Sequence, residues 1–343
     1  MKIKNKKVAV FGAYGHTGNF VVGELIKRGF LPVLIGRDKG KLMSFGAKYP
    51  NLEMRVASTE NAKSLDRALT GTEAVINCAG PFLDTAVPLV EAAIRSRIHY
   101  LDVTAEQTAV KNIFENFAEP ARNAGISVVP AAAFFGGLAD LLATAAMNDW
   151  TEADEIKIAV ALDSWHPTEG TRTTGKRNTA RRLVVSNKKS EFLSNPPPTM
   201  TWDFPPPFAN QDVVELPFSE IITVSSHLQS SEIHSFINLA PLTDIRNPNT
   251  PHPKAVDENG RSKQIFLMDV IVKKDGTERR MTATGQDIYA ISAPIVVEAV
   301  SRILDNRFKR IGVGSMGDLF DAAEVLMSLS PGQFSLETNL KSG

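Results

Sequence analysis

Short apolar runs alternate with amphipathic segments over the first 130 residues of the chain. We expect strands at 7–11, 32–35, 52–56, 74–77, 99–103 and 126–129. The stretches between them carry apolar residues at helical spacing, and the longest of these helices is expected to break near Pro120. Strands that are apolar on both faces and alternate with helices are typical of a parallel sheet. The pattern predicts an α/β unit with a doubly wound parallel sheet.

The pattern changes beyond residue 150. Residues 155–162 alternate between apolar and polar side chains, as a half-buried strand does. Two further runs, 264–273 and 277–284, flank an Asp-Gly dipeptide, which is typical of a tight hairpin turn. These runs predict a second domain of the α+β type that carries an antiparallel sheet.

Two proline-rich segments, 195–207 and 247–253, are expected to be loops. Helical spacing returns at 292–304 and 316–329. A chain of 343 residues is long enough for more than one core. We therefore expect an α/β domain at 1–132, an α+β substrate and dimerisation domain at 133–285, and C-terminal helices at 286–343 that return to the first domain.

The first strand runs directly into a glycine-rich turn, and a helix follows the turn. Glycines there let the backbone approach phosphates, while N–H groups and the positive end of the helix dipole face the charge. Between a strand and a helix, such a turn is typical of a Rossmann-type dinucleotide-binding domain. The residues expected to contact the dinucleotide are Gly12, Tyr14, Gly15, His16, Thr17 and Gly18.

The end of the second strand bears on the choice of cofactor. NAD-binding domains usually carry an acidic residue here, which accepts from the ribose 2′-hydroxyl. This chain has Gly36, Arg37 and Asp38, with Lys41 close behind. Gly36 leaves space, Arg37 can pair with a 2′-phosphate, and Lys41 adds charge. We favour NADP, although Asp38 could turn inward and make NAD possible.

Composition is that of a globular protein without a nucleic-acid partner. Hydrophobic residues make up 43% of the chain, and 38 acidic residues balance 38 basic ones. A zero net charge provides no basic surface for nucleic acid. A single cysteine, Cys78, excludes an internal disulfide and favours a reducing compartment.

One stretch, 128–147, approaches the length and apolarity of a membrane span. Pro130, the Gly136-Gly137 pair and Asp140 argue instead for a strand end, a loop and a buried helix. The basic N-terminus runs into the first strand and lacks the apolar core of a signal peptide. We expect a cytoplasmic protein with no membrane span.

Seven segments, in order along nearly the whole chain, carry a more specific signal. They are GAYGHTG with its following GRD, INCAGPF, HYLDVTAE, PAAAFFGGLADLLA, TEGTRTT, TGQDIYAISAPIVVEA and GVGSMGDLFDAAEVL. Together they resemble the saccharopine dehydrogenase-like oxidoreductases, or saccharopine reductase family, whose distant members include trans-acting enoyl reductases. Residues 131–137 depart from the glycine-rich GFDS-type loop that is common in relatives, so a relative's substrate does not carry over.

The resemblance implies that the end of the fourth strand borders the nicotinamide ribose, and small residues there would let the backbone come close. The residues concerned are Asn77, Cys78, Ala79, Gly80 and Pro81, and we add Thr104 after the fifth strand. Cys78 has no paired base and is interpreted as a packing residue rather than a nucleophile. The substrate is expected to contact Phe82, Phe134, Phe135, His166 and Arg172.

Hydride transfer to a C=N, C=O or activated C=C bond also needs a proton donor. None of the four tyrosines has a lysine four residues later, so the Tyr-Lys pair of short-chain dehydrogenases is absent. Asp102, Tyr100 and His99 are the candidates near the end of the fifth strand. The alternative for Asp102 is a helix-capping carboxylate, and both readings stay open.

The sequence leaves two classes of function. The first is an NAD(P)H-dependent oxidoreductase, with NADPH favoured, that transfers hydride to a C=N, C=O or activated C=C bond of a small or lipid-like substrate. The second is a non-catalytic dinucleotide-binding protein that regulates or assembles. No histidine or cysteine cluster predicts a metal site. The long hairpin at 264–284 suggests a sheet face for a homodimer.

Overall fold

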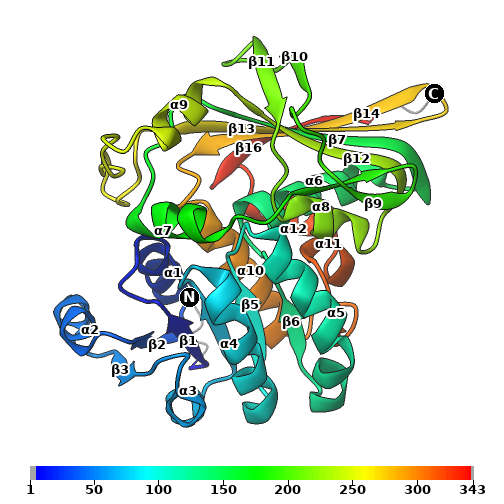
Figure 1. The fold of residues 1–343 in the computed structure, drawn as a ribbon. Helices are drawn as coiled ribbons and strands as arrows, with labels where there is room; N and C mark the ends of the chain where they lie inside the picture. The colour runs from blue at the N-terminus through cyan, green and yellow to red at the C-terminus, as the bar shows by residue number, and fades with distance from the viewer. Residues whose placement is uncertain (1–4, 341–343) are drawn as a thin grey trace.

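The computed structural model describes residues 5–340, and these form two sheets with helices packed around them (Figure 1). The first sheet has seven strands in these residues, all parallel. In spatial order they are β15 (Gly312–Val313), β6 (Ser127–Val129), β5 (His99–Asp102), β4 (Ala74–Asn77), β1 (Lys7–Phe11), β2 (Leu31–Gly36) and β3 (Glu53–Val56). The predicted doubly wound sheet is confirmed.

Helices cover both faces of this sheet. On one face lie α1 (His16–Lys27), α2 (Lys39–Gly46) and α10 (Ser292–Leu304). On the other lie α3 (Ala62–Leu69), α4 (Phe82–Ser96) and α5 (Gln107–Ala124). The expected break at Pro120 is wrong, because α5 continues through that residue to a left-handed cap at Gly125. Packing of its apolar face outweighs the loss of one backbone hydrogen bond.

The second sheet is mixed rather than purely antiparallel, because β12 runs parallel to β7. Its main path, in spatial order, is β10 (Thr199–Asp203), β11 (Asn210–Glu215), β12 (Gln229–Asn238), β7 (Glu152–Leu162), β13 (Ile265–Lys274), β14 (Thr277–Gln286) and β16 (Phe334–Asn339). Strands β8 (Leu183–Ser186) and β9 (Lys189–Phe192) pair beside β12. All other pairs in this sheet are antiparallel.

The structure of this region differs from the sequence-based expectations in two places. The proline-rich segment 195–207 contains strand β10, whose Trp202 packs on the outer face of the sheet beside Phe204 and Phe236. The last strand, β16, was not expected at all. By contrast, the hairpin of β13 and β14 forms as predicted, and Asp275 and Gly276 both adopt positive φ angles in its turn.

Seven further helices lie within residues 5–340. They are η1 (Phe134–Leu138, a π-helix), α6 (Ala139–Met147), α7 (Glu169–Arg177), α8 (Glu220–Ser225), α9 (Ala240–Arg246), α11 (Met316–Leu319) and α12 (Ala322–Leu329). The single helix expected at 316–329 is therefore two helices. Helix α6 packs against β13 and β14, and this covers the inner face of the second sheet.

The two halves of the molecule share one core. All thirteen residues of α10 are buried, because this helix packs against α1 on one side and η1 on another. The C-terminal segment then contributes β15 to the first sheet and β16 to the second. The domain limits given above stay a prediction, and this shared core means that the limits cross well-packed contacts.

The hairpin gives no support to the dimerisation argument. Its apolar side chains, such as Phe266 and Val270, face the inner core, and Leu267 on the outer face is covered by the cluster around Trp202 and Phe204. No helix within residues 5–340 is long and apolar enough to cross a membrane. Residues 128–147 instead form the end of β6, a loop, η1 and α6, with Asp140 buried.

Candidate cofactor and substrate cavity

The glycine-rich turn is shaped by two close approaches. Gly12 has a φ of +83°, and its amide donates to the carbonyl of Ile35 at 2.9 Å. A Cβ on Gly18 would lie 2.2 Å from the carbonyl oxygen of Gly12, so only glycine lets α1 start this close to the turn. This geometry leaves the N-terminus of α1 open to a ligand and fits a pyrophosphate.

The charged side chains that bear on the choice of cofactor follow the end of β2. Asp38 caps α2, with its Oδ1 accepting from the Lys41 amide at 2.9 Å, and the Asp38 amide donates to the Tyr14 hydroxyl at 3.2 Å. The Tyr14 ring fills the space beside Gly36, where a Cβ would lie 2.2 Å from Cε1. One carboxylate oxygen of Asp38 is thus engaged with α2, and Asp38, Arg37 and Lys41 are all exposed on the cavity wall.

The end of β4 approaches the same turn from the other side. A Cβ on Gly12 would lie 2.9 Å from the Cβ of Ala79, so the two loops touch. Buried Asn77 supports this loop, because its Oδ1 accepts from the Ala79 amide at 3.0 Å. Burial raises the pKa of the Cys78 thiol, which keeps it protonated and supports its interpretation as a packing residue.

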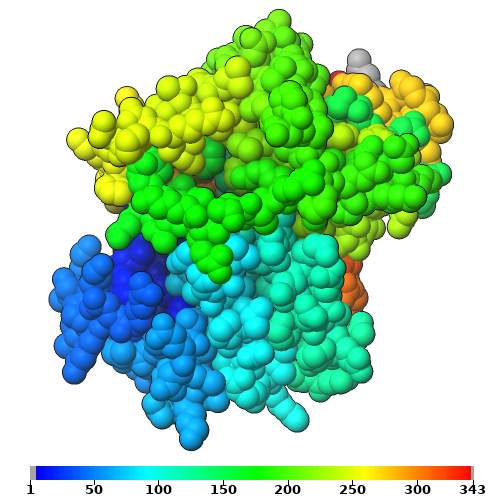
Figure 2. Space-filling model, in the orientation of Figure 1, coloured from blue at the N-terminus to red at the C-terminus, as the bar shows by residue number. Residues whose placement is uncertain are grey.

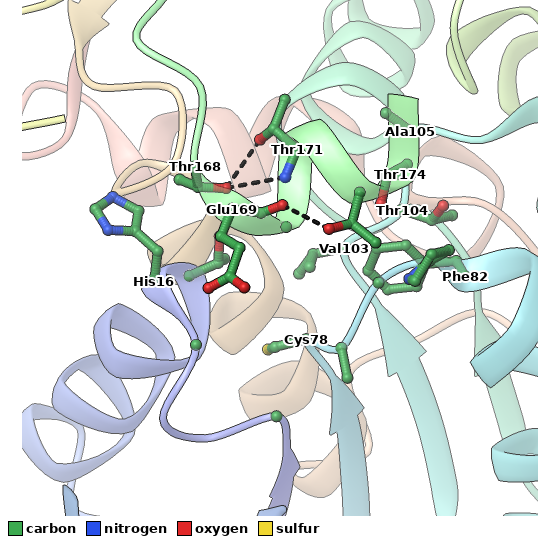
Figure 3. A pocket seen from close by; sticks show the side chains of 18 of the residues that line it. His16, Cys78, Phe82, Val103, Thr104, Ala105, Thr168, Glu169, Thr171 and Thr174 are labelled. Atoms are coloured by element: carbon green, nitrogen blue, oxygen red, sulfur yellow. Dashed lines mark hydrogen bonds between the residues drawn. The ribbon is translucent and has the colours of Figure 1, made fainter. Parts of the chain in front are cut away.

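These loops face the second domain across one cavity of about 1330 Å³. In Figure 2 a recess separates the blue N-terminal surface from the green segment that contains α7. Figure 3 shows α7 lying over this space, with Thr168, Glu169, Thr171 and Thr174 above Cys78. The Thr174 Oγ1 atom lies only 2.7 Å from where a Cβ on Gly80 would stand, so α7 packs directly on the β4 loop.

Most of the residues expected at the site from the sequence lie on the wall of this cavity. They are Gly12, Tyr14, Gly15, His16, Thr17, Gly36, Arg37, Lys41, Cys78, Ala79, Gly80, Pro81, Phe82, Thr104, Phe134 and Phe135. Those placed off the wall are Gly18, Asn77, His99, Tyr100, Asp102, His166 and Arg172. Gly18 and Asn77 shape the wall from behind, as described above.

The three candidates for proton donor are not brought to the cavity. Asp102 is fully buried, and its Oδ1 accepts from the amides of Thr104 and Ala131 at 3.0 and 2.8 Å. Tyr100, equally buried, donates to Asp102 Oδ2 at 2.9 Å. Burial raises the pKa of Asp102 to about 6, although these three hydrogen bonds oppose the shift. Asp102 ties the loop after β5 to the loop after β6.

The placement of His99 near the crevice is wrong for a geometric reason. It is the first residue of β5, at the amino end of the strand, whereas the cavity lies at the carboxyl ends. Its Nδ1 accepts from the Ser127 amide at 3.0 Å, and burial lowers its pKa to about 4. His99 is therefore a neutral hydrogen-bond acceptor at the amino end of the first sheet.

Arg172 is also directed elsewhere. Its Nη2 donates to the carbonyls of Asn247 and Thr250 at 3.2 and 2.8 Å, which anchors the loop after α9. A different arginine, Arg182, lines the cavity, and no motif in the sequence singles it out. Arg182 directly precedes β8, and only the tertiary fold brings it to the cavity.

Tyr289 was also missed as a wall residue. Its hydroxyl accepts from Trp165 Nε1 at 3.0 Å and lies 3.0 Å from Thr171 Oγ1. Thr171 Oγ1 in turn lies 2.9 Å from Thr168 Oγ1 (Figure 3). Burial raises the pKa of Tyr289, so the phenol stays neutral and keeps its proton. The three hydroxyls form a chain along the cavity wall through which a proton can move.

His16 is a further titratable residue on the cavity wall. Its ring packs edge-on against Phe20 and Tyr289, with centroids 5.3 Å away in each case. Its Nε2 is buried and has no hydrogen-bond partner within residues 5–340. Burial lowers the pKa of His16, so its ring is neutral at the first turn of α1. In the same described residues, no group of three or more potential ligands could hold a metal ion.

Comparison with known proteins decides the nature of the first domain. Residues 8–129 match the family described as "Saccharopine dehydrogenase NADP binding domain". Residues 8–129 thus resemble the NADP-binding domain of saccharopine dehydrogenases. The resemblance drawn from the seven segments is confirmed, and NADP is the cofactor of this domain family.

Similar proteins extend the comparison. The probable mitochondrial saccharopine dehydrogenase-like oxidoreductase of Arabidopsis thaliana is 30% identical over 143 residues, which are 37% of this chain and 31% of that protein. The trans-acting enoyl reductase of Mycobacterium ulcerans is 24% identical over 211 residues, 57% of this chain and 50% of that protein. The matched region of this chain thus spans about a third to a half of the length of these relatives.

The fold as a whole has a solved counterpart. Apo saccharopine dehydrogenase (L-Glu forming) from Saccharomyces cerevisiae matches with a TM-score of 0.69 at 12% identity, over 98% of this chain and 100% of that one. This likeness covers both sheets, so the combination of an NADP-binding domain with a mixed-sheet second domain is that of the saccharopine dehydrogenase fold.

Proposed function

We propose that this protein is an NADPH-dependent oxidoreductase that reduces a C=N, C=O or activated C=C bond of a small or lipid-like substrate. The observation that carries the proposal is a cavity whose wall joins the glycine-rich turn of the first domain to aromatic and hydroxyl side chains of the second. NADPH supplies the hydride when it is bound. The residues of the chain bind and orient the reactants and supply the proton.

The distribution of charge at the end of β2 supports NADPH over NADH. Arg37 and Lys41 are exposed on the wall and carry no carboxylate partner within residues 5–340. Asp38 is engaged in capping α2. Two exposed cations suit a 2′-phosphate, whereas one of the two oxygens of Asp38, the acceptor that a plain 2′-hydroxyl needs, is taken by the cap of α2. Gly12 and Gly15 would hold the pyrophosphate, and Cys78 to Gly80 would lie beside the nicotinamide.

We infer that the proton comes from the hydroxyl chain rather than from Asp102, Tyr100 or His99. Those three lie off the wall, whereas Tyr289 and Thr171 are on it. Within the chain, the Tyr289 oxygen already accepts from Trp165, which leaves its own proton for Thr171. A hydroxyl relay of this kind can replace a proton that has been delivered to substrate.

The relatives support an oxidoreductase, and the name of the Mycobacterium ulcerans protein supports C=C bonds among the candidates. The wall of the second domain, with Phe135, Trp165 and Phe218, favours an apolar substrate body over a polar amino acid. A non-catalytic nucleotide-binding protein would have no need of the aromatic wall.

The proposal is tested by fluorescence titration with NADPH and with NADH, using the wild type and Arg37→Ala. Loss of a charged hydrogen-bonding partner should weaken NADPH about 10- to 100-fold and leave NADH within about twofold. Lys39→Ala is the matched control, since Lys39, at the start of α2 two residues after Arg37, is exposed but lies off the cavity wall. Equal weakening of both nucleotides would exclude the 2′-phosphate role, and no binding of either to the wild type would exclude the oxidoreductase.

Two further predictions accompany this function. We propose a cytoplasmic location on the basis of the single cysteine, and subcellular fractionation tests it. We also keep the homodimer as a proposal, now without the hairpin argument. Sedimentation that shows a monomer at micromolar concentration would remove it.

A further inference from the structure

Three aromatic side chains of the second domain, Phe135, Trp165 and Phe218, line part of the cavity, and we call this cluster the aromatic arm. The rings of Phe135 and Phe218 are tilted with centroids 4.3 Å apart. Trp165 lies 6.1 Å from the first ring and 6.3 Å from the second. The three rings come from η1, the loop after β7 and the loop before α8, so the arm exists only in the folded protein. An arm of this kind takes an apolar group.

One cation, Arg182, stands in this aromatic arm. Its guanidinium carbon lies 4.7 Å from the centroid of the Phe218 ring, and its Nη1 donates to the carbonyl of Pro217 at 2.5 Å. The next residue, Leu183, is fixed by Gln107, which accepts from its amide at 2.7 Å and donates to its carbonyl at 2.9 Å. Stacking and backbone support hold the guanidinium in place without using its whole donor set.

Arg182 lacks the partner that other buried arginines have. The side chains of Arg28, Arg279 and Arg302 are 21%, 6% and 2% exposed, and each has a carboxylate oxygen within 2.7 Å. No carboxylate within residues 5–340 lies at ion-pair distance from Arg182. Glu220 acts on it only electrostatically, and burial lowers the pKa of Arg182 while it raises that of Glu220. A cation on an apolar wall without an anion is costly.

We propose that the aromatic arm binds the carboxylate of an apolar monocarboxylic acid, with the carboxylate paired to Arg182 and the aliphatic or aromatic body against Phe135 and Trp165. This inference rests on the proposed function and names its substrate class. The planar guanidinium matches a carboxylate through two parallel hydrogen bonds, which an ester or amide cannot accept as charged pairs. A single cation beside three aromatic rings fits one carboxylate on an apolar body rather than a polycarboxylate.

The test is a calorimetric titration of the protein without added nucleotide, using trans-2-octenoate and its methyl ester as probes. The acid should bind the wild type at least about tenfold more tightly than the ester. Arg182→Met should remove this preference by weakening the acid alone, and Arg182→Lys should restore part of it. Equal binding of acid and ester to the wild type, or a preference that survives in Arg182→Met, would overturn the proposal.

Arg181→Met is the matched control. Arg181 is the preceding residue and also stacks on a phenylalanine, Phe192, with its guanidinium carbon 4.3 Å from the ring centroid. It lies off the cavity wall, so this variant should keep the wild-type preference for the acid. NADPH titration of the same samples separates the two proposals. Failure of the carboxylate site leaves NADPH binding intact, whereas failure of the proposed function appears as absent NADPH binding.

Discussion

The two walls of the cavity are built in different ways. The wall of the first domain comes from the carboxyl ends of successive strands within residues 12–106, and its close contacts are made by backbone and glycines. The opposite wall takes side chains from η1, the loop after β7, α7, the loop before α8 and the start of α10. The first wall presents amides and two exposed cations, and the second presents aromatic rings, hydroxyls and Arg182.

This difference indicates how the cofactor and the substrate are each recognised. A pyrophosphate is met by main-chain geometry, which tolerates almost no substitution at the glycines. The substrate wall rests on side chains carried by separate elements, so single residues can change there without loss of the fold. Substitutions in the first wall should therefore affect cofactor binding and stability together, while substitutions in the second should affect ligand preference alone.

The largest effect is expected from Gly18→Ala. The new Cβ would lie 2.2 Å from the Gly12 carbonyl oxygen, and α1 would have to move away from the turn. NADPH binding should weaken by more than about 100-fold, with about 1–3 kcal/mol of lost stability. Titration and urea unfolding measure the two effects.

The control for this variant lies on the same helix. Gly23 has nothing within 4 Å of a built Cβ, so Gly23→Ala should add about 0.5–1 kcal/mol of stability and leave NADPH binding unchanged. Wild-type NADPH affinity in Gly18→Ala would contradict the backbone account of the first wall.

A smaller, pH-dependent effect is expected from Asp102→Asn. Burial raises the pKa of Asp102 from 3.8 to about 6, so the folded protein holds a proton that the unfolded chain releases between these values. The stabilisation is complete below about pH 4 and is lost as pH rises through 6, which amounts to about 3 kcal/mol at most. The variant should lack this slope, so its stability relative to the wild type should rise from pH 4 to pH 7.

Urea unfolding at pH 4, 5, 6 and 7 measures this difference, with exposed Glu191→Gln as a control that follows the wild type. Since Asp102 lies off the wall, NADPH affinity should stay within about threefold of the wild type. A pH profile for Asp102→Asn that runs parallel to that of the wild type would contradict the raised pKa of Asp102. A large loss of NADPH affinity would contradict its position off the cavity wall.

The smallest effect concerns the contact between the two walls. Arg177 at the end of α7 pairs with Asp84 on α4 at 3.0 Å, and both side chains are about half exposed. No residue of α7 is buried, and this ion pair joins α7 to the first domain in addition to the contact of Thr174 with Gly80. Arg177→Ala should lower stability by less than about 0.5 kcal/mol and speed NADPH release about two- to fivefold, an effect that salt reduces.

Stopped-flow measurement of NADPH release checks this expectation. Lys176→Ala, which removes a neighbouring charge with no ion pair in residues 5–340, should release NADPH at the wild-type rate. Equal release from all three proteins would show that α7 covers the cavity without restraining the cofactor.

Much of the first wall could be predicted from the sequence, because its signals are local. Gly12 to Gly18 follow one strand directly, and Arg37 follows the next, so spacing alone places them at one edge of the sheet. His99 shows the limit of this reasoning. The strand was predicted correctly, but the residue lies at its amino end, so a correct element gave a misplaced side chain.

The second wall could not be predicted in the same way. Trp165, Arg182 and Tyr289 are separated by long stretches of chain, and only the packing of α7 and α10 brings them together. Strand β10 was missed because the prolines on either side of it predict a loop, while Trp202 supplies packing that holds the strand in the sheet. Strand β16 is mostly exposed and short on apolar residues, so its pairing with β14 gave no periodic signal.

A crystal structure of the protein with bound NADP⁺ would test the central claim most directly. We predict that the dinucleotide occupies the cavity, with its 2′-phosphate on Arg37 and Lys41, its nicotinamide beside Cys78 and Gly80, and α7 above it. A dinucleotide bound outside this cavity, or a 2′-phosphate turned away from Arg37, would contradict the account.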